Sequence, residues 1–362
     1  MRRTILGRGR TIICVMLIAF ISMFGLAGCG GSQKEPAAKD GNIQIVTTIF
    51  PSYDWTMNVL GDNPGDVEVT MLLEKGTDLH NYQPTVEDIL KISTCDLFIY
   101  VGGESDKWVD GVLKEASNKD MKVINLLEAL GDGAKEEEMV EGMQEADHDH
   151  EEEEVDHDHE ENHDEEADHE DGEDEEDHHH GEESEYDEHI WLSLRNAATL
   201  TEIIEGEIEA INPENSSAYK ENLKAYIGQL EALDKEYKDA VDKANNKTLL
   251  FGDRFPFRYL TDDYGISYYA AFVGCSAETE ASFETITFLA QKTDELKLKS
   301  VMTIEGGSTK IAETIIQNTE SKNQKILSLD SMQSTTGKDV EEGKTYLSIM
   351  ESNLEVLKEA LQ

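Results

Sequence analysis

The chain of 362 residues contains only four cysteines, and their positions limit the chemistry open to it. Cys14 and Cys29 lie in the N-terminal region, whereas Cys95 and Cys275 lie in the body of the chain. Because no Cys-x-x-Cys pair occurs, a thiolate zinc knuckle is excluded. Cys95 precedes one predicted strand and Cys275 follows another in the other half of the chain, so we expect no disulfide between them.

Basic residues are also scarce: 31 Lys and Arg stand against 78 Asp and Glu, which gives a formal net charge of −47. Residues 136–188 hold 31 of the acidic side chains and no Lys or Arg, so the rest of the chain carries a net charge of only −16. An acidic surface disfavours nucleic acid as a partner and favours small cations. No Gly-x-Ser-x-Gly sequence occurs, so a serine hydrolase of that kind is not supported.

The N-terminus combines arginines with an apolar run that ends at Cys29. A basic start, an apolar stretch and small residues at its end are typical of a secretory signal, and the run is short for a bilayer span. Leu26-Ala-Gly-Cys29 resembles the bacterial lipobox, in which the cysteine is lipidated and becomes the first residue of the mature chain. We therefore predict a signal peptide over 1–28 and a lipidated Cys29 with a polar tether over 29–42. An uncleaved anchor helix is the alternative.

Short apolar segments rich in β-branched residues alternate with helical patterns in both halves of the chain. Such continuous apolar segments are typical of strands buried in a parallel sheet. The predicted strands are Ile43–Phe50, Val67–Leu73, Asp96–Gly102 and Lys122–Leu127 in the first half, and Thr248–Gly252, Ile266–Gly274, Ser300–Glu305 and Lys325–Asp330 in the second. We therefore predict an α/β protein of two similar lobes, each a four-stranded parallel sheet flanked by helices.

Two long helices are predicted between the halves, separated by the helix-breaking sequence Ile211-Asn-Pro-Glu-Asn215. The second covers Pro213–Ala244, carries apolar residues at three- and four-residue spacing, and would be ~45 Å long at ~1.5 Å per residue. We expect this rigid backbone helix, over 212–245, to join an N-terminal lobe over 43–211 to a C-terminal lobe over 246–362. Such a connection should allow little hinging.

Nine of the eleven histidines lie in a single acidic segment of the N-terminal lobe. The segment 132–187 lacks hydrophobic periodicity, so we predict that it is a disordered acidic His-rich loop. Its Asp-His repeats offer many weak, interchangeable ligand sets, and we interpret them as accessory metal ligands rather than the principal site. These histidines are His148, His150, His157, His159, His163, His169, His178, His179 and His180. The alternative is a solvated acidic insert whose histidines are incidental.

Potential metal ligands follow the predicted strands of both lobes. His80 follows the second strand, Asp253 the fifth, and Asp330 ends the eighth, while His189 begins the first long helix. Ligands of open parallel sheets bind beyond the carboxyl ends of the strands. Two imidazoles and two carboxylates from four loops would make a closed four-ligand site for a divalent metal. Because such a shell leaves no open position for a reacting water, we predict a binding protein rather than an enzyme.

Several motifs resemble one family, the metal-binding solute proteins of ABC importers for zinc and manganese. Gly76-Thr-Asp-Leu-His-Asn-Tyr-Gln-Pro84 is similar to the family's first histidine motif, and His189-Ile-Trp-Leu192 with the following Asn-Ala is similar to the second. Asn212-Pro-Glu-Asn215 resembles the opening of the family's backbone helix. The resemblance covers nearly the whole chain after residue 42. It implies that His80 and His189 are ligands from the N-terminal lobe and that Asp330 matches the family's C-terminal Asp.

The third ligand is less firmly placed by this resemblance. Aligned on Phe251-Gly252, Asp253 takes the ligand position; aligned on Phe257 and Tyr259, the match falls on Arg254, which cannot bind a cation. We adopt Asp253, with Cys275, Glu278, Glu280 and Glu305 as further candidates near the same edge.

The resemblance also implies a function. An acidic His-rich loop between the two histidine motifs goes with the zinc importers, and imidazole suits Zn²⁺, although the harder His₂Asp₂ set leaves Mn²⁺ open. We expect a monomeric, lipid-anchored binding protein on the extracytoplasmic face of the cell membrane, which captures Zn²⁺ between its lobes and delivers it to an ABC permease. The alternatives are a manganese-binding homologue and a surface metal buffer or adhesin.

Overall fold

The computed structural model of the chain describes residues 42–62, 65–144, 185–276 and 280–362. The predicted signal peptide, Cys29, nearly all of the tether and all nine loop histidines lie outside these residues. Within the described part of the chain, no helix has both the length and the apolar character that are needed to cross a membrane.

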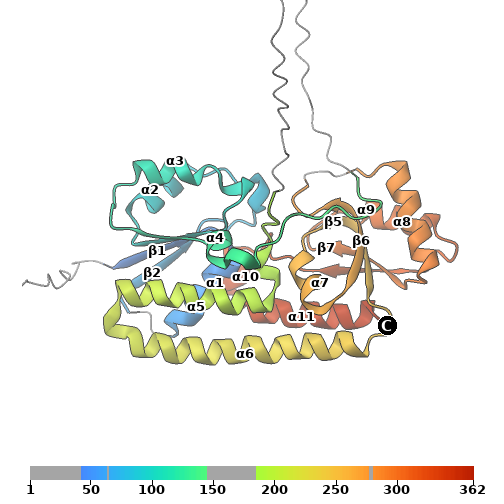
Figure 1. Cartoon of the computed structure of the whole chain (residues 1–362). Helices are drawn as coiled ribbons and strands as arrows, with labels where there is room; N and C mark the ends of the chain where they lie inside the picture. Colours follow the sequence, from blue (N-terminus) through green and yellow to red (C-terminus); the bar gives the residue numbers. More distant parts are fainter. Residues whose placement is uncertain (1–41, 63–64, 145–184, 277–279) are drawn as a thin grey trace, which may run out of the picture. The chain divides into compact units, whose positions relative to one another are not determined.

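The N-terminal lobe is built on a parallel sheet with the strand order β2-β1-β3-β4 (Figure 1). All four residues of β3 are buried, as expected for a strand covered on both faces. The strands are β1 (Ile43–Thr47), β2 (Val67–Met71), β3 (Leu97–Tyr100) and β4 (Lys122–Asn125). The helices of this lobe are α1 (Phe50–Leu60), α2 (Val86–Thr94), α3 (Val109–Glu115) and α4 (Leu126–Leu130).

The C-terminal lobe repeats this plan with the strand order β6-β5-β7-β8, again all parallel. Every residue of β7 is buried. The strands are β5 (Thr248–Phe255), β6 (Ser267–Val273), β7 (Ser300–Ile304) and β8 (Lys325–Leu329). The helices are α7 (Arg258–Tyr264), α8 (Phe283–Glu295), α9 (Lys310–Asn318), α10 (Gly337–Glu341) and α11 (Tyr346–Ala360). The prediction of two similar four-stranded parallel lobes is therefore confirmed.

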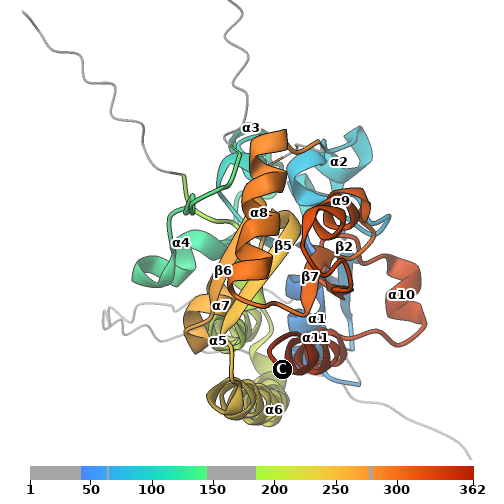
Figure 2. The ribbon, with the colours of Figure 1, turned by 90° about the vertical axis from the view of Figure 1, so that its right-hand side faces the viewer.

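Two long helices, α5 (Leu194–Ile211) and α6 (Ser216–Lys243), connect the lobes. The 28 residues of α6 give it a length of ~42 Å at ~1.5 Å per residue. Its apolar stripe packs on α1 and α5 toward one end and on α11 toward the other (Figure 1), and Figure 2 views the helix nearly along its axis. Tyr237 is fully buried there, and its hydroxyl donates to the Met350 carbonyl of α11 at 2.6 Å. The predicted backbone helix is confirmed, and it is fixed by packing along its length.

Seven of the eight predicted strands run one to three residues past the observed ends, whereas the fifth was predicted too short. The strand β5 runs to Phe255, three residues past its predicted end, because Arg254 and Phe255 still pair with Phe272 and Val273 of β6 after a register shift. Asp253 therefore lies inside the strand at this irregularity and not in a loop beyond it.

The disorder that we predicted over 132–187 is wrong at both ends of that segment. Glu136 forms an antiparallel bridge with Tyr186, and the Gln144 amide donates to the Ala271 carbonyl of β6 at 2.9 Å. The buried Tyr259 hydroxyl accepts from the Lys135 amide and donates to the Asp187 carbonyl, both at 2.9 Å. The two ends pair with each other and with Ala271 and Tyr259 of the C-terminal lobe, and the local lack of apolar periodicity does not indicate such distant partners.

Candidate metal centre

His80 is presented by a short 3-10 helix, η1 (Leu79–Asn81), in the connection between β2 and α2. The Asp78 carboxylate caps this helix by accepting from the His80 amide at 3.0 Å. The His80 Nδ1 atom lies 2.9 Å from the Ser105 hydroxyl and 3.3 Å from a Glu188 carboxylate oxygen. These contacts hold the ring by its Nδ1 atom and leave its Nε2 atom facing His189.

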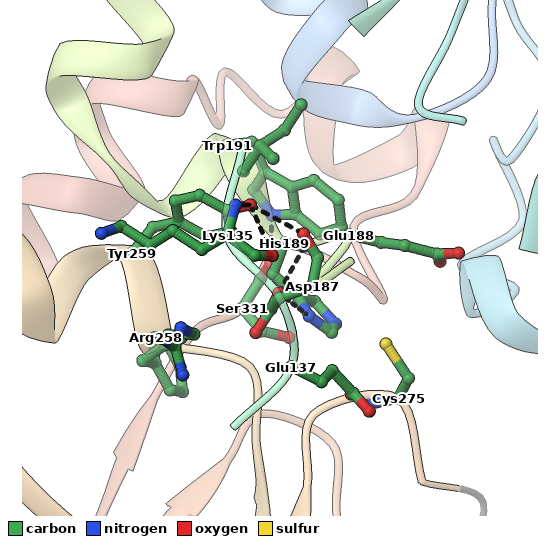
Figure 3. A network of polar contacts seen from close by, with 12 residues as sticks. Lys135, Glu137, Asp187, Glu188, His189, Trp191, Arg258, Tyr259, Cys275 and Ser331 are labelled. Atoms are coloured by element: carbon green, nitrogen blue, oxygen red, sulfur yellow. Dashed lines mark hydrogen bonds and ion pairs between the residues drawn. The ribbon is translucent and has the colours of Figure 1, made fainter. Parts of the chain in front are cut away.

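His189 immediately precedes the 3-10 helix η4 (Ile190–Leu192), and its side chain is fully buried. Asp187 accepts from both the His189 amide, at 2.8 Å, and its Nδ1 atom, at 2.9 Å (Figure 3). The next residues are fastened to the C-terminal lobe, since the Trp191 indole donates to the Ser331 carbonyl at 2.8 Å and the Tyr346 hydroxyl donates to the Trp191 carbonyl at 2.7 Å. His189 thus stands where the two lobes meet.

The structure brings both predicted histidines together. Their Nε2 atoms are 3.1 Å apart, and the ring centroids are separated by 5.1 Å. The thiol of Cys275 completes the group: one ligand atom from each of the three residues lies within 4.8 Å of the others. Among the described residues this is the one cluster of three or more His, Cys, Asp or Glu side chains that could hold a metal ion.

The carboxylates behind the histidines shape the electrostatics of the group. Burial alone would raise the pKa of Glu188, but hydrogen bonds from His80 and Ser105 outweigh it and hold the pKa below its usual range. Burial, with the nearby charges of Glu137, Asp187 and Glu188, raises the pKa of the Cys275 thiol far above its usual range. At neutral pH the metal-free group therefore combines an ionised carboxylate with a neutral thiol, and a cation that took the sulfur as a ligand would displace the thiol proton.

Two glycines allow this close packing. Gly103 has a φ of 77°, and a Cβ atom there would lie 2.4 Å from a Glu188 carboxylate oxygen. At Gly274, a Cβ atom would lie 3.0 Å from His189 Cε1 and 2.9 Å from the Phe255 carbonyl. Side chains at these positions would push Glu188 and the end of β6 out of place.

The two predicted carboxylate ligands do not join the group. The Asp253 oxygens accept from the Arg254 amide at 2.9 Å and from the Ile304 amide at 3.2 Å. Asp330 accepts from the Met332 amide at 2.8 Å and lies 4.0 Å from the Lys344 ammonium. In each case the carboxylate holds the backbone of its own lobe, and burial raises its pKa.

The further candidates differ in position. Glu305 accepts four hydrogen bonds from residues 331–334 and so holds the loop after β8. Glu280 is exposed, and Glu278 lies outside the described residues. Arg254 forms an ion pair with Asp78 across the lobes. The Gln333 side chain satisfies its neighbours when its amide nitrogen donates to the Asp78 carboxylate, at 3.0 and 3.1 Å. In this orientation its amide oxygen lies 3.2 Å from His189 Nε2.

The sequence reasoning missed the residues that orient the histidines. Asp187 and Glu188 stand directly before His189, but they were counted as part of the acidic segment. The usable signal was this adjacency, because a carboxylate beside a potential ligand histidine often holds its second ring nitrogen. Ser105 and Gln333 gave no sequence signal. Cys95 and Cys275 are both free thiols, which confirms the expectation of no disulfide between them.

Comparison with known proteins identifies the family of the chain. The model of the ZnuA family, described as zinc-uptake complex component A, periplasmic, matches residues 45–360. The chain belongs to this family. It is 31% identical over 349 residues to the zinc-binding lipoprotein AdcA of Streptococcus pneumoniae, covering 95% of this chain and 60% of that protein. It is 28% identical over 338 residues to the high-affinity zinc uptake system protein ZnuA of Bacillus subtilis, covering 93% of both chains.

Solved structures of the family share the fold. The Zn(II)-bound ZnuA-like domain of Streptococcus pneumoniae AdcA superimposes with a TM-score of 0.63 at 27% identity, covering 89% of this chain and 99% of that one. This member of the ZnuA family spans 60% of the length of full AdcA. The family consists of uptake components that bind a substrate, not of enzymes. A His-Glu-x-x-His spacing, the pattern of many zinc hydrolases, does occur at His159–His163, within the acidic segment and outside the described residues.

Proposed function

We propose that this protein captures Zn²⁺ between its two lobes, outside the cytoplasm, and delivers it to an ABC-transporter permease. His80 and His189 are the proposed ligands from the N-terminal lobe. The membership of the ZnuA family and the zinc-binding names of its relatives support the cargo, and the lipobox resemblance at Cys29 supports attachment to the membrane.

The observation that carries the proposal is the mutual arrangement of the two imidazoles. Zn–N bonds of about 2.0–2.1 Å in a tetrahedral site place two ligand nitrogens about 3.3 Å apart. The two Nε2 atoms are 3.1 Å apart, so a zinc ion can bridge them with little movement of either ring.

The surroundings of the two rings support the same conclusion. Each Nδ1 atom faces a carboxylate, Glu188 for His80 and Asp187 for His189. Carboxylate–histidine–zinc chains of this kind fix the ring orientation and make the imidazole a stronger ligand. His189 is fully buried and the His80 side chain is 9% exposed, and a divalent cation between their Nε2 atoms, which are 3.1 Å apart, would take a lone pair from each ring.

Asp253 and Asp330 stay predictions from the sequence, as does the accessory role of the nine loop histidines. The loop leaves the described structure after Gln144 and returns at Glu185, close to the proposed site, because the Glu137 amide donates to the Glu185 carbonyl at 2.7 Å. Weak sites in the loop would therefore raise the local zinc concentration beside the tight site, without being part of it.

Calorimetric titration with Zn²⁺ and Mn²⁺ tests the proposal. The proteins are the full chain and a variant in which 145–184 is replaced by a short linker, each with and without His80→Ala. We expect one tight zinc site that survives the loop deletion and is lost with His80→Ala. Tight binding that persists without His80, or that disappears with the loop, would place function in the acidic segment and make the protein a metal buffer.

Delivery to a permease needs a separate experiment in cells. A strain that lacks this chain should grow poorly under zinc limitation, and the wild-type chain should restore growth whereas the His80→Ala variant should not. Full rescue by His80→Ala would contradict a transport role for the site. The matched control is Lys107→Ala, since Lys107 is an exposed residue of the same lobe whose ion pair is with the neighbouring Glu104.

A further inference from the structure

We propose that the Cys275 thiolate is the third protein ligand, completing a His₂Cys set that favours Zn²⁺ over Mn²⁺. This inference rests on the proposed function and specifies the site further. It departs from the set expected from the sequence, in which the C-terminal lobe contributes the carboxylates of Asp253 and Asp330.

The position of Cys275 in the fold is the first argument. Strands β2 and β6 occupy the same place in their sheets, next to the first strand of each lobe. His80 lies in the connection after β2, and Cys275 lies two residues after the end of β6. The two residues thus come from corresponding connections, which face each other across the meeting point of the lobes. His189, from the segment between the lobes, contacts both sides.

The distances are the second argument. Zn–N bonds of about 2.0–2.1 Å and a Zn–S bond of about 2.3 Å place nitrogen and sulfur about 3.6 Å apart in a tetrahedral site. The ligand atoms of His80, His189 and Cys275 all lie within 4.8 Å of one another. Zinc binding therefore needs each nitrogen–sulfur separation to shorten by about 1.2 Å at most. Glu137 anchors the backbone of this turn by accepting from the Cys275 amide at 3.1 Å (Figure 3).

The third argument is that the nearby carboxylates have other partners. Asp253 and Asp330 each accept backbone amides of their own lobe, and Asp78 is paired with Arg254. The Cys275 thiol instead has the Glu137 carboxylate as its side-chain partner, and that contact ends when the thiol gives up its proton. On binding, the Zn–S bond forms as the S–H bond breaks, and the proton leaves to solvent. Thiolate is a soft ligand that suits Zn²⁺, whereas Mn²⁺ prefers carboxylate and water oxygens.

Cobalt substitution of the full chain tests this inference. Co²⁺ replaces Zn²⁺ in such sites, and a thiolate bound to Co²⁺ gives an intense near-ultraviolet charge-transfer absorption that imidazole and carboxylate do not give. We expect this absorption in the wild-type protein, saturating at one Co²⁺ per chain and lost on addition of one equivalent of Zn²⁺. It should vanish in Cys275→Ser and persist in the matched control Cys95→Ala, because the Cys95 thiol donates to the Ile92 carbonyl inside the N-terminal lobe.

The affinities give a second readout. Cys275→Ser should weaken zinc binding by at least ~100-fold, more than the ~10–100-fold that follows loss of a residue behind the ligands. Cys275→Asp should lower the preference for Zn²⁺ over Mn²⁺ at least ~10-fold, because a carboxylate is a harder ligand. If the wild-type protein binds Co²⁺ and Zn²⁺ tightly but lacks the absorption, the inference about Cys275 is wrong while the proposed function stands. The same follows if Cys275→Ser binds both metals with unchanged affinity. Absence of any tight site in the wild-type protein would overturn the proposed function as well.

Discussion

The two lobes have the same strand order but use their acidic residues differently. In the N-terminal lobe and the segment that follows it, Asp187 and Glu188 face the histidine rings and orient them. In the C-terminal lobe, Asp253 and Asp330 accept backbone amides. A carboxylate at the correct edge of a parallel sheet is therefore not sufficient evidence for a ligand, because the turns at that edge also need acceptors for their amides.

The corresponding helices α1 and α7 show a second contrast between the lobes, in the surroundings of one Asp on each helix. Replacing these residues should give the largest expected effect, a change in the free energy of unfolding. α1 and α7 each follow the first strand of their lobe; α1 carries the buried Asp54 and α7 the half-buried Asp263. Asp54 of α1 accepts from Asn58 at 2.9 Å and Tyr226 at 3.4 Å, and burial raises its pKa to about 7. Asp263 of α7 accepts from Ser193 at 2.6 Å and has Arg195 at 3.5 Å.

We expect Asp54→Asn to stabilise the metal-free protein at pH 8 by on the order of 3 kcal/mol, and by clearly less at pH 5. The pKa of Asp54 is raised in the folded state, so its contribution is fully present below pH 4 and is lost as the pH rises to about 7. Urea unfolding at both pH values measures the effect. Asp263→Asn is the matched control and should give a smaller gain: burial also raises the pKa of Asp263, but Ser193 and Arg195 counteract the rise, and the variant leaves Arg195 without this partner. An equal gain in both variants would contradict the contrast.

Replacing a carboxylate that contacts a histidine Nδ1 atom should give the next largest effect, a loss of zinc affinity. Asp187→Asn should lower the zinc affinity ~10–100-fold, because the His189 ring loses a charged acceptor that orients it and strengthens it as a ligand. Competition with a chelating dye measures the affinity. The control is Glu185→Gln, an exposed residue of the same segment whose affinity should match that of the wild-type protein. If the two variants bind zinc equally well, Asp187 has no role in the site.

The ion pair between Arg254 and Asp78 should have a smaller effect. It connects β5 of one lobe to the cap of the helix η1 that carries His80 in the other, and both side chains are mostly buried. Arg254→Gln should weaken zinc binding by roughly 5-fold through faster release, which corresponds to about 1 kcal/mol. Stopped-flow release into excess chelator measures the rate. Arg258→Gln, which breaks an ion pair with Glu138 outside the histidine group, should leave it unchanged.

Replacing the carboxylates of Asp253 and Asp330 in the C-terminal lobe should have the smallest effect on zinc affinity. Asp330→Asn keeps an oxygen that can accept from the Met332 amide, so the loop after β8 should stay in place. We expect the zinc affinity to change by less than ~3-fold, and the same for Asp253→Asn. Either variant losing more than ~100-fold would restore that carboxylate as a ligand and remove the contrast between the lobes.

Much of the fold follows from local sequence patterns. The continuous apolar segments indicated all eight strands, and the spacing of Tyr219, Tyr226, Leu230 and Tyr237 indicated the long helix that connects the lobes. These features depend on the periodicity of neighbouring residues, which is visible without a structure. The strand β5 was predicted too short because its last pairs form with β6, and that pairing is not encoded in the Asp253–Phe255 segment itself.

The sequence by itself determined the lobes, the connecting helix and the two histidines of the candidate site. His80 and His189 stand out because His is rare outside the acidic segment: His80 follows a predicted strand at the ligand-binding edge, and His189 begins the first predicted long helix. Only the tertiary structure decided which groups surround them. Cys275 lies 86 residues beyond His189 in the chain, and the paired β5 and β6 strands bring it to the histidines. The contacts of Asp187, Glu188 and Asp253 depend on which backbone amides and rings the packed lobes leave in need of an acceptor, and no local pattern specifies that.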